Sequence, residues 1–230
     1  MGVIWFLIGI TVVALLSAVS ALAGDYEDGV AAYNRRDYPA AFQSLQPAAE
    51  HGNAVAQYDV GLMYEYGDGV AQDYAEAMQW FHRAADQGYA NAQHHLGLMY
   101  RQGIGVAQNY AVAARWIRKA ADQGDAAAQT SLGEMYLGGL GVARNNAEAA
   151  KWYGKAADQG DASAESRLGE MFVRGQGVAR NYVLAHMWFS LAAANGMDAA
   201  GKARDQLASL MTSTEIEKAQ RLVRAWKPTK

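Results

Sequence analysis

The pattern of apolar and polar residues repeats along this chain with a constant step of 36 residues. Each period contains an apolar stripe at helical spacing, a Gly-x-Gly loop, a second helical stripe and a closing glycine. Four columns show the step: Gly61, Gly97, Gly133 and Gly169; Val70, Val106, Val142 and Val178; Trp80, Trp116, Trp152 and Trp188; and Gly88, Gly124, Gly160 and Gly196. Such a period is typical of a stacked array in which each unit buries its apolar face against the next.

Each period predicts two helices joined by the glycine loop. In the first full period, the first helix, called helix A below, begins after Asn53, because asparagine is a favoured N-cap residue. It ends at Gly67-Asp68-Gly69, where glycine can adopt the left-handed conformation that terminates helices. The second helix, helix B, begins after Asp73 and ends at Gly88. Because Gly61 inside helix A costs about 1 kcal/mol relative to alanine, we expect neighbouring helix backbones to approach closely there.

The period also predicts the layout of the chain. Four repeats occupy residues 53–88, 89–124, 125–160 and 161–196, and a degenerate helix pair without the glycine loop precedes them at residues 25–52. After Gly196 the pattern decays, so residues 197–230 are expected to form C-terminal capping helices. Thr212 and Glu215 have the spacing of a capping box, which places the start of the last helix.

Residues 1–24 contain no charged side chain and end in Ala21-Leu22-Ala23, a small-x-small cleavage pattern. This segment is predicted to be a secretory signal peptide. The alternative is an uncleaved membrane anchor, because residues 2–24 as a helix would reach roughly 30 Å, enough to span a bilayer. Both interpretations place the array outside the cytoplasm, with the periplasm as the expected compartment.

The charge and composition of the chain exclude several classes of ligand and site. The net charge of −3 does not favour nucleic acid as a ligand. Residues 25–86 carry 11 acidic and 3 basic residues, whereas residues 87–230 carry 12 acidic and 17 basic residues. The chain has no cysteine, which excludes disulfides, thiolate metal sites and a cysteine nucleophile. Its histidines are scattered and no phosphate loop is present, so no cofactor or metal is expected.

The repeated motif resembles the Sel1-like repeat, a relative of the tetratricopeptide repeat. The residues that carry this resemblance are Gly52-x-Ala54-x-Ala56-Gln57, Gly61-x-Met63-Tyr64, Gly67-x-Gly69-Val70, Tyr74, Ala77, Trp80 and Ala84-Ala85. The resemblance implies an all-α fold, a right-handed α-solenoid superhelix of antiparallel helix pairs. It also implies an adaptor for protein complexes, since many bacterial members are exported and act in envelope signalling or assembly. Some cysteine-rich members bind or hydrolyse β-lactams, and this chain lacks their cysteines.

A partner surface can be predicted by comparing the repeats with one another. In helix A, one set of positions stays similar across the four copies and another set varies, and the variable set falls on one arc of the helix. The variable positions are Tyr58, Asp59, Leu62, Glu65 and Tyr66; His94, His95, Leu98, Arg101 and Gln102; Thr130, Ser131, Glu134 and Leu137; and Ser166, Arg167, Glu170, Val173 and Arg174. We call these residues the helix-A surface. The constant face is expected to form the stacking core, which leaves the helix-A surface to bind a protein or peptide along a concave side. Alternatively, the helix-A surface varies between repeats only because any residue is tolerated where a side chain faces solvent.

These observations predict a non-catalytic protein-interaction scaffold in the bacterial cell envelope, with a role in signalling or complex assembly. The alternative from another class is an envelope hydrolase acting on β-lactams or peptidoglycan fragments. Ser166 and Ser190 lack the sequence context of a nucleophile elbow, which disfavours that alternative. The membrane is expected as a partner only through residues 2–24, and the sequence does not define an oligomeric state.

Overall fold

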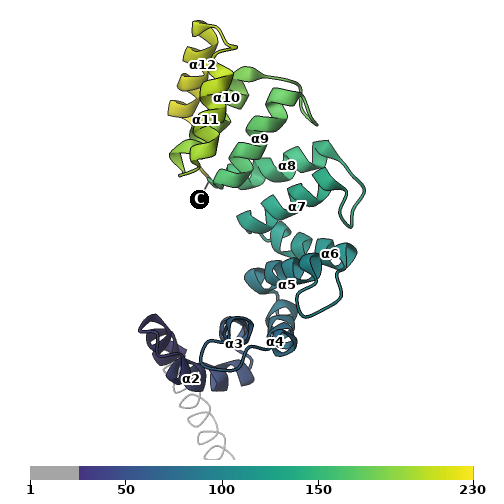
Figure 1. Cartoon of the computed structure of the whole chain (residues 1–230), viewed down its shortest axis with the longest axis vertical. Helices are drawn as coiled ribbons and strands as arrows, with labels where there is room; N and C mark the ends of the chain where they lie inside the picture. The colour runs from purple at the N-terminus through teal and green to yellow at the C-terminus, as the bar shows by residue number, and fades with distance from the viewer. Residues whose placement is uncertain (1–25, 230) are drawn as a thin grey trace, which may run out of the picture. The chain divides into compact units, whose positions relative to one another are not determined.

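The computed structural model describes residues 26–229, and within this range the regular secondary structure is entirely α-helical (Figure 1). A helical stretch at residues 26–34 precedes the labelled helices. The helices that follow are α2 (Tyr38–Glu50), α3 (Ala54–Tyr66), α4 (Tyr74–Asp86), α5 (Ala90–Gln102), α6 (Tyr110–Asp122), α7 (Ala126–Gly138), α8 (Asn146–Ala157), α9 (Ala162–Arg174), α10 (Tyr182–Ala194), α11 (Asp198–Ala208) and α12 (Ser213–Ala225). Consecutive helices pack as pairs, as in α3 with α4, α7 with α8 and α9 with α10. The predicted all-α solenoid is confirmed.

The chain divides into two compact units. Among the described residues, the N-terminal unit comprises residues 26–96 and 104–106, and the C-terminal unit comprises residues 97–103 and 107–229. Helix α5 contributes its first half to one unit and its second half to the other. The signal-peptide prediction at residues 1–24 lies outside the described residues. No helix in the described part of the chain is long and apolar enough to cross a membrane.

Side-chain caps and glycines set the helix ends where the sequence predicted them. Asn53 Oδ1 accepts hydrogen bonds from the backbone N–H groups of Val55 and Ala56, both at 3.0 Å. Gly67 ends α3 with a φ of 75°, in the left-handed region that favours glycine. The capping box of Thr212 and Glu215 is present in both directions and starts α12. Local sequence therefore encodes the hairpin geometry of each repeat.

The glycine inside each helix A makes room for a large side chain of the following helix B. A Cβ atom on Gly61 would lie 2.6 Å from the Phe81 ring, and one on Gly133 would lie 2.7 Å from the Tyr153 ring. Ile117 occupies this place against Gly97, and Phe189 occupies it against Gly169. We call each such contact a glycine seat. A close approach at these glycines was expected and is present. The atoms nearest to the glycine belong mainly to a side chain of helix B, however, and not to a helix backbone.

The N-terminal helix pair contains the same seat. A Cβ atom on Gly29 would lie 2.6 Å from Leu45 Cγ, and Leu45 is 1% exposed. Leu45 precedes Phe81 by one full period of 36 residues, whereas Gly29 precedes Gly61 by only 32. A shorter turn between residues 34 and 38 explains this difference. The first pair is therefore built on the same contact as the later repeats.

Buried glutamines join consecutive helices. The Gln57 side-chain amide donates to the Ala49 carbonyl at the end of α2 (3.0 Å), and the Gln87 amide donates to Gln57 Oε1 (2.7 Å). In the C-terminal unit, the Gln129 amide donates to the Ala121 carbonyl (3.2 Å), and Gln159 donates to Gln129 (2.9 Å). These bonds satisfy polar groups inside the solenoid, which would be costly to leave unpaired.

The last repeat replaces this glutamine with a carboxylic acid. Glu165 stands at the position of Gln57 and Gln129, and it is 0% exposed. The Asn195 amide donates to both Glu165 carboxylate oxygens, at 3.2 and 3.0 Å. Burial raises the pKa of Glu165 to about 7; the bond from Asn195 acts in the opposite direction, and the charge of Asp161 adds to the increase. A carboxylate has no donor equivalent to the glutamine amide, so the ionised form fits this position less well.

The glycine seat predicts opposite effects for two glycine-to-alanine changes in one helix pair. Gly133→Ala should lower the free energy of unfolding by roughly 1 to 3 kcal/mol, because the added methyl overlaps the Tyr153 ring. Gly154→Ala is the control: it lies inside α8 with no atom within 4 Å of the added methyl. It should raise stability by up to about 1 kcal/mol. Urea unfolding measures both, and equal effects would contradict the seat.

Glu165 predicts a stability that falls as the pH rises. Because the folded-state pKa lies above the unfolded one, the folded state holds its proton longer, and stability is lost between about pH 4.5 and 7. Glu165→Gln should remove this loss and stabilise the protein by roughly 1 to 3 kcal/mol at about pH 8. Gln129→Glu is the matched reverse change and should introduce a loss of the same sign. Chemical unfolding across this pH range tests both variants, and parallel wild-type and Glu165→Gln profiles would refute the assignment.

Candidate protein-interaction surface

The helix-A surface is divided between the two units. The N-terminal unit holds the positions on α3 together with His94 and His95, and the C-terminal unit holds the positions on the second half of α5 and on α7 and α9. Tyr66 is an exposed aromatic side chain of this set, at 60% exposure. Thr130 and Ser131 are buried, at 9% and 8% exposure. Because buried side chains are not accessible to a partner, the structure does not support the prediction that these two residues bind one. The other positions are half-buried or exposed.

Many of the variable positions pair with the neighbouring helix A. In the N-terminal unit, His95 Nε2 lies 2.6 Å from Glu65 Oε2, and the Tyr58 ring contacts Tyr89 with centroids 5.4 Å apart. Tyr58 also contacts the His95 ring at 5.9 Å. These contacts join α3 to the start of α5. The residues at these positions therefore differ between repeats for two reasons. Some face solvent, and others have to fit the side chain that they contact on the neighbouring helix A.

The C-terminal unit shows the same kind of pairing. Arg101 Nη1 donates to Glu134 Oε2 at 3.0 Å, which links α5 to α7. Thr130 donates to Asp161, the N-cap of α9, at 3.1 Å. This contact explains the burial of Thr130, since the start of the next helix A lies against it. Partly exposed ion pairs of this kind stabilise a fold only weakly and can be exchanged for a ligand.

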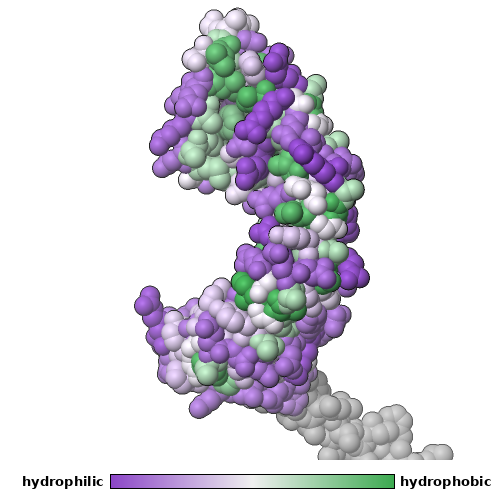
Figure 2. Space-filling view, turned by 45° about the vertical axis from the view of Figure 1, so that its right-hand side comes forward, coloured by the Kyte–Doolittle hydropathy of each residue, from purple (hydrophilic) through white to green (hydrophobic). Residues whose placement is uncertain are grey.

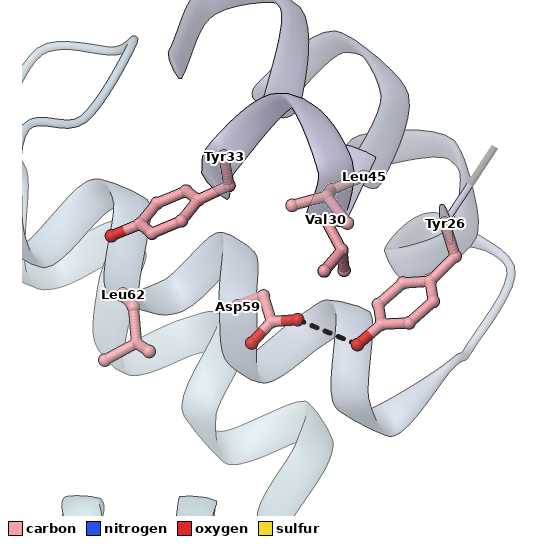
Figure 3. A pocket seen from close by; sticks show the side chains of 6 residues that line it. All are labelled: Tyr26, Val30, Tyr33, Leu45, Asp59 and Leu62. Carbon is pink, nitrogen blue, oxygen red and sulfur yellow. Dashed lines mark hydrogen bonds between the residues drawn. The ribbon is translucent and has the colours of Figure 1, made fainter. Parts of the chain in front are cut away.

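A cavity opens beside the helix-A surface of the N-terminal unit (Figure 3). Its volume is about 300 Å³, at the lower end of the range for ligand pockets. Its lining residues come from the 26–34 stretch, α2 and α3: Tyr26, Val30, Tyr33, Leu45, Asp59 and Leu62. The walls are therefore apolar or aromatic, and one carboxylate is present. Asp59 and Leu62 belong to the predicted surface.

Asp59 is the charged group of this cavity. The Tyr26 hydroxyl donates to Asp59 Oδ2 at 3.1 Å, as the dashed line in Figure 3 shows. Tyr33 donates instead to Asp68, at 2.9 Å. Burial raises the pKa of Asp59 to about 6, although the bond from Tyr26 acts in the opposite direction. A carboxylate that is partly removed from water inside a cavity is a candidate for binding a ligand.

The C-terminal unit has a second cavity on its part of the helix-A surface. Glu170, Val173 and Arg174 line it together with residues of α10 and α11, and its volume is about 320 Å³. Leu210, 70% exposed, borders this cavity. Single exposed hydrophobic side chains are common on protein surfaces, so Leu210 by itself does not indicate a partner. The face shown in Figure 2 carries hydrophobic residues as separate patches among hydrophilic ones.

A polar cavity between α10, α11 and α12 contains His186, Ser190, Arg204 and Asp205. The Ser190 hydroxyl donates to the His186 backbone carbonyl at 2.7 Å and lies 3.4 Å from His186 Nδ1. Burial, with the nearby Arg204 charge, lowers the pKa of His186. The hydroxyl is thus engaged by the backbone rather than aligned for proton transfer to the ring. Across residues 26–229, no three His, Cys, Asp or Glu side chains are grouped to hold a metal ion.

The half of the N-terminal cavity that precedes α3 was not predicted from the sequence. Tyr26, Val30 and Leu45 belong to the helix pair that precedes the regular repeats, and their side chains meet Asp59 only after stacking. The available signal was the 36-residue step from Leu45 to Phe81, which aligns the two helices B. It would have extended the repeat comparison to the first pair.

The chain belongs to the Sel1 repeat family. The Sel1 repeat model matches residues 17–53, 54–89, 90–125, 126–161 and 162–197. Sel1 repeats generally mediate protein–protein interactions, and the fold is typically a non-enzymatic scaffold. The family therefore agrees with the observed fold.

Solved structures show the same architecture. A Sel1 repeat protein from Oxalobacter formigenes is 39% identical and superposes with a TM-score of 0.69, over 74% of this chain and 50% of that one. A protective antigen of uropathogenic Escherichia coli strains is 30% identical with a TM-score of 0.58, over 91% of this chain and 54% of that one. An immunity protein from Pseudomonas aeruginosa, 22% identical with a TM-score of 0.51 over 75% of this chain and 67% of that one, shares the fold.

The chain spans about half the length of the first two of these proteins. No curated protein matches its sequence. The comparisons therefore establish the family and the fold.

The raised pKa of Asp59 predicts that this residue destabilises the unliganded protein. Its unfolded-state pKa lies near 4, so stability is lost as the pH rises from about 4 to 6. Asp59→Asn should therefore raise the free energy of unfolding at about pH 8 by roughly 1 kcal/mol, reduced because the group is partly exposed. It should have little effect below about pH 4. Thermal unfolding at both pH values tests this, and a destabilised variant at high pH would contradict it.

Proposed function

We propose that this chain is a non-catalytic scaffold that binds protein segments along the helix-A surface of its units. The observation that carries the proposal is the N-terminal cavity, which lies where the sequence predicted a partner surface and joins Asp59 to apolar walls. The second cavity at Glu170, Val173 and Arg174 supports the same role for the C-terminal unit. Membership of the Sel1 repeat family supports a protein partner rather than a small substrate.

The compartment we propose is the bacterial cell envelope, with a role in signalling or complex assembly. Export is supported by the uncharged segment 1–24 and its Ala21-Leu22-Ala23 ending. Cleavage after this segment would release the array into the periplasm, and retention would leave it anchored by residues 2–24. Both forms present the same helix-A surface to partners.

The proposal predicts that photo-crosslinkers on the helix-A surface capture one partner in cells. Suitable positions are Tyr66 in the N-terminal unit and Arg167 in the C-terminal unit, because both are exposed. Gln79 on α4 and Lys151 on α8 are matched controls, exposed on helices B. The same protein should be recovered by mass spectrometry from the first two positions and from neither control. Capture from all four positions alike, or no specific capture, would contradict the proposal.

A further inference from the structure

We propose that the N-terminal cavity binds a lysine side chain of the partner segment, with the Asp59 carboxylate pairing with its ammonium group. This inference rests on the proposed function, since the lysine belongs to a segment lying on the helix-A surface. It goes further by naming the chemistry that the surface recognises.

The cavity has the shape of a site for an apolar stem with a polar end. Val30, Leu45 and Leu62 supply aliphatic walls, and the two tyrosine rings close the sides (Figure 3). Its volume of about 300 Å³ exceeds what one or two water molecules need. Aliphatic walls gain from burying methylene groups, each of which contributes about 0.8 kcal/mol when fully buried. A lysine side chain offers four such groups below its charge.

The charge on the cavity side is unbalanced. Among the side chains of residues 26–229, only the Tyr26 hydroxyl donates a hydrogen bond to Asp59, and it uses Oδ2. The lining contains no lysine or arginine. A carboxylate removed from water without a cation is unfavourable, and an incoming cation offsets that cost. The cavity therefore selects a positive ligand over a neutral one of the same shape.

The geometry favours lysine over arginine. Arginine gains its advantage from two parallel bonds to both oxygens of a carboxylate. Here the Tyr26 hydroxyl already donates to Oδ2, so an arginine fork would have to share that oxygen, whereas Oδ1 accepts no bond from a side chain of the described residues. A compact ammonium group needs only one such oxygen, and it can also lie against the faces of Tyr26 and Tyr33.

The surrounding charge favours the same ligand. Residues 25–86 carry 11 acidic and 3 basic residues, so the N-terminal unit attracts cationic segments. Tyr33 lines the cavity and its hydroxyl donates a hydrogen bond to Asp68, so a second carboxylate lies close to the site. A lysine-containing segment would therefore be drawn to the unit and held by the cavity.

The test is calorimetric titration of the full chain with a short probe, acetylated and amidated Ala-Ala-Lys-Ala-Ala, at millimolar concentration. Two further probes replace the lysine by norleucine or by arginine. We expect the lysine peptide to bind about tenfold more tightly than the norleucine peptide, which keeps the stem and removes the charge. Equal binding of the lysine and norleucine peptides, no binding of the lysine peptide, or tighter binding of the arginine peptide would each overturn the inference.

Variants locate the effect in the cavity. Asp59→Asn should weaken the lysine peptide about tenfold and leave the norleucine peptide unchanged. Asp86→Asn is the charge-matched control: Asp86 is exposed at the end of α4, outside the cavity, and its loss should change neither affinity. Leu62→Trp keeps Asp59 but fills the cavity, so it should also abolish lysine binding. Circular dichroism melts confirm that each variant is folded, and unchanged lysine binding in both cavity variants would overturn the inference.

Crosslinking from Tyr66 in the Asp59→Asn chain separates this inference from the proposed function. Undiminished capture of the same partner would refute the lysine site and leave the scaffold in place. Lysine-peptide binding that depends on Asp59, without any partner captured from wild type, would support the cavity and refute the scaffold. Loss of capture together with loss of lysine-peptide binding supports both.

Discussion

The fold depends on one repeated constraint, the seat that a glycine in helix A provides for a large side chain of helix B. Gly61 with Phe81 and Gly133 with Tyr153 show it most directly, and Gly29 with Leu45 extends it to the first helix pair. A methyl group cannot enter these contacts, so the two helices approach more closely than alanine would allow. The loss of helix propensity, about 1 kcal/mol for each glycine, is offset by burying rings such as those of Phe81 and Tyr153, both 0% exposed.

The seat also determines which side of helix A remains available. Since one face of the helix is committed to helix B and another to the glutamine links, the variable positions are left to meet either the next helix A or a ligand. Several of them pair with the next helix A and stay partly exposed, as Glu65 and His95 illustrate with a 2.6 Å contact on a half-buried surface. Asp59 differs from these positions because its described bond comes from a neutral hydroxyl, that of Tyr26. A negative charge left in this state is the feature that a cationic partner would use.

Local signals in the sequence were sufficient for the architecture, because caps such as Asn53 and left-handed glycines such as Gly67 act within a few residues. The seat of the first pair was missed because a turn shorter by four residues shifts Gly29 out of the 36-residue register. The exposure of the residues on the helix-A surface was predicted only in part. Comparing repeats identifies which positions vary, but it cannot distinguish solvent from a partner in the adjacent repeat. Thr130, buried against Asp161, is the clearest case.

The central claim is that a ligand occupies the variable face of helix A in the N-terminal unit, and not its packing face. This claim can be tested by titrating methyl-labelled protein with the lysine probe peptide and recording nuclear magnetic resonance spectra. The methyl signals that shift show where the peptide binds. The account predicts shifts of the Val30 and Leu62 methyl signals, with the buried Val60 and Leu96 methyls unchanged. Shifts confined to the C-terminal unit, or spread evenly over buried and cavity methyls, would contradict it.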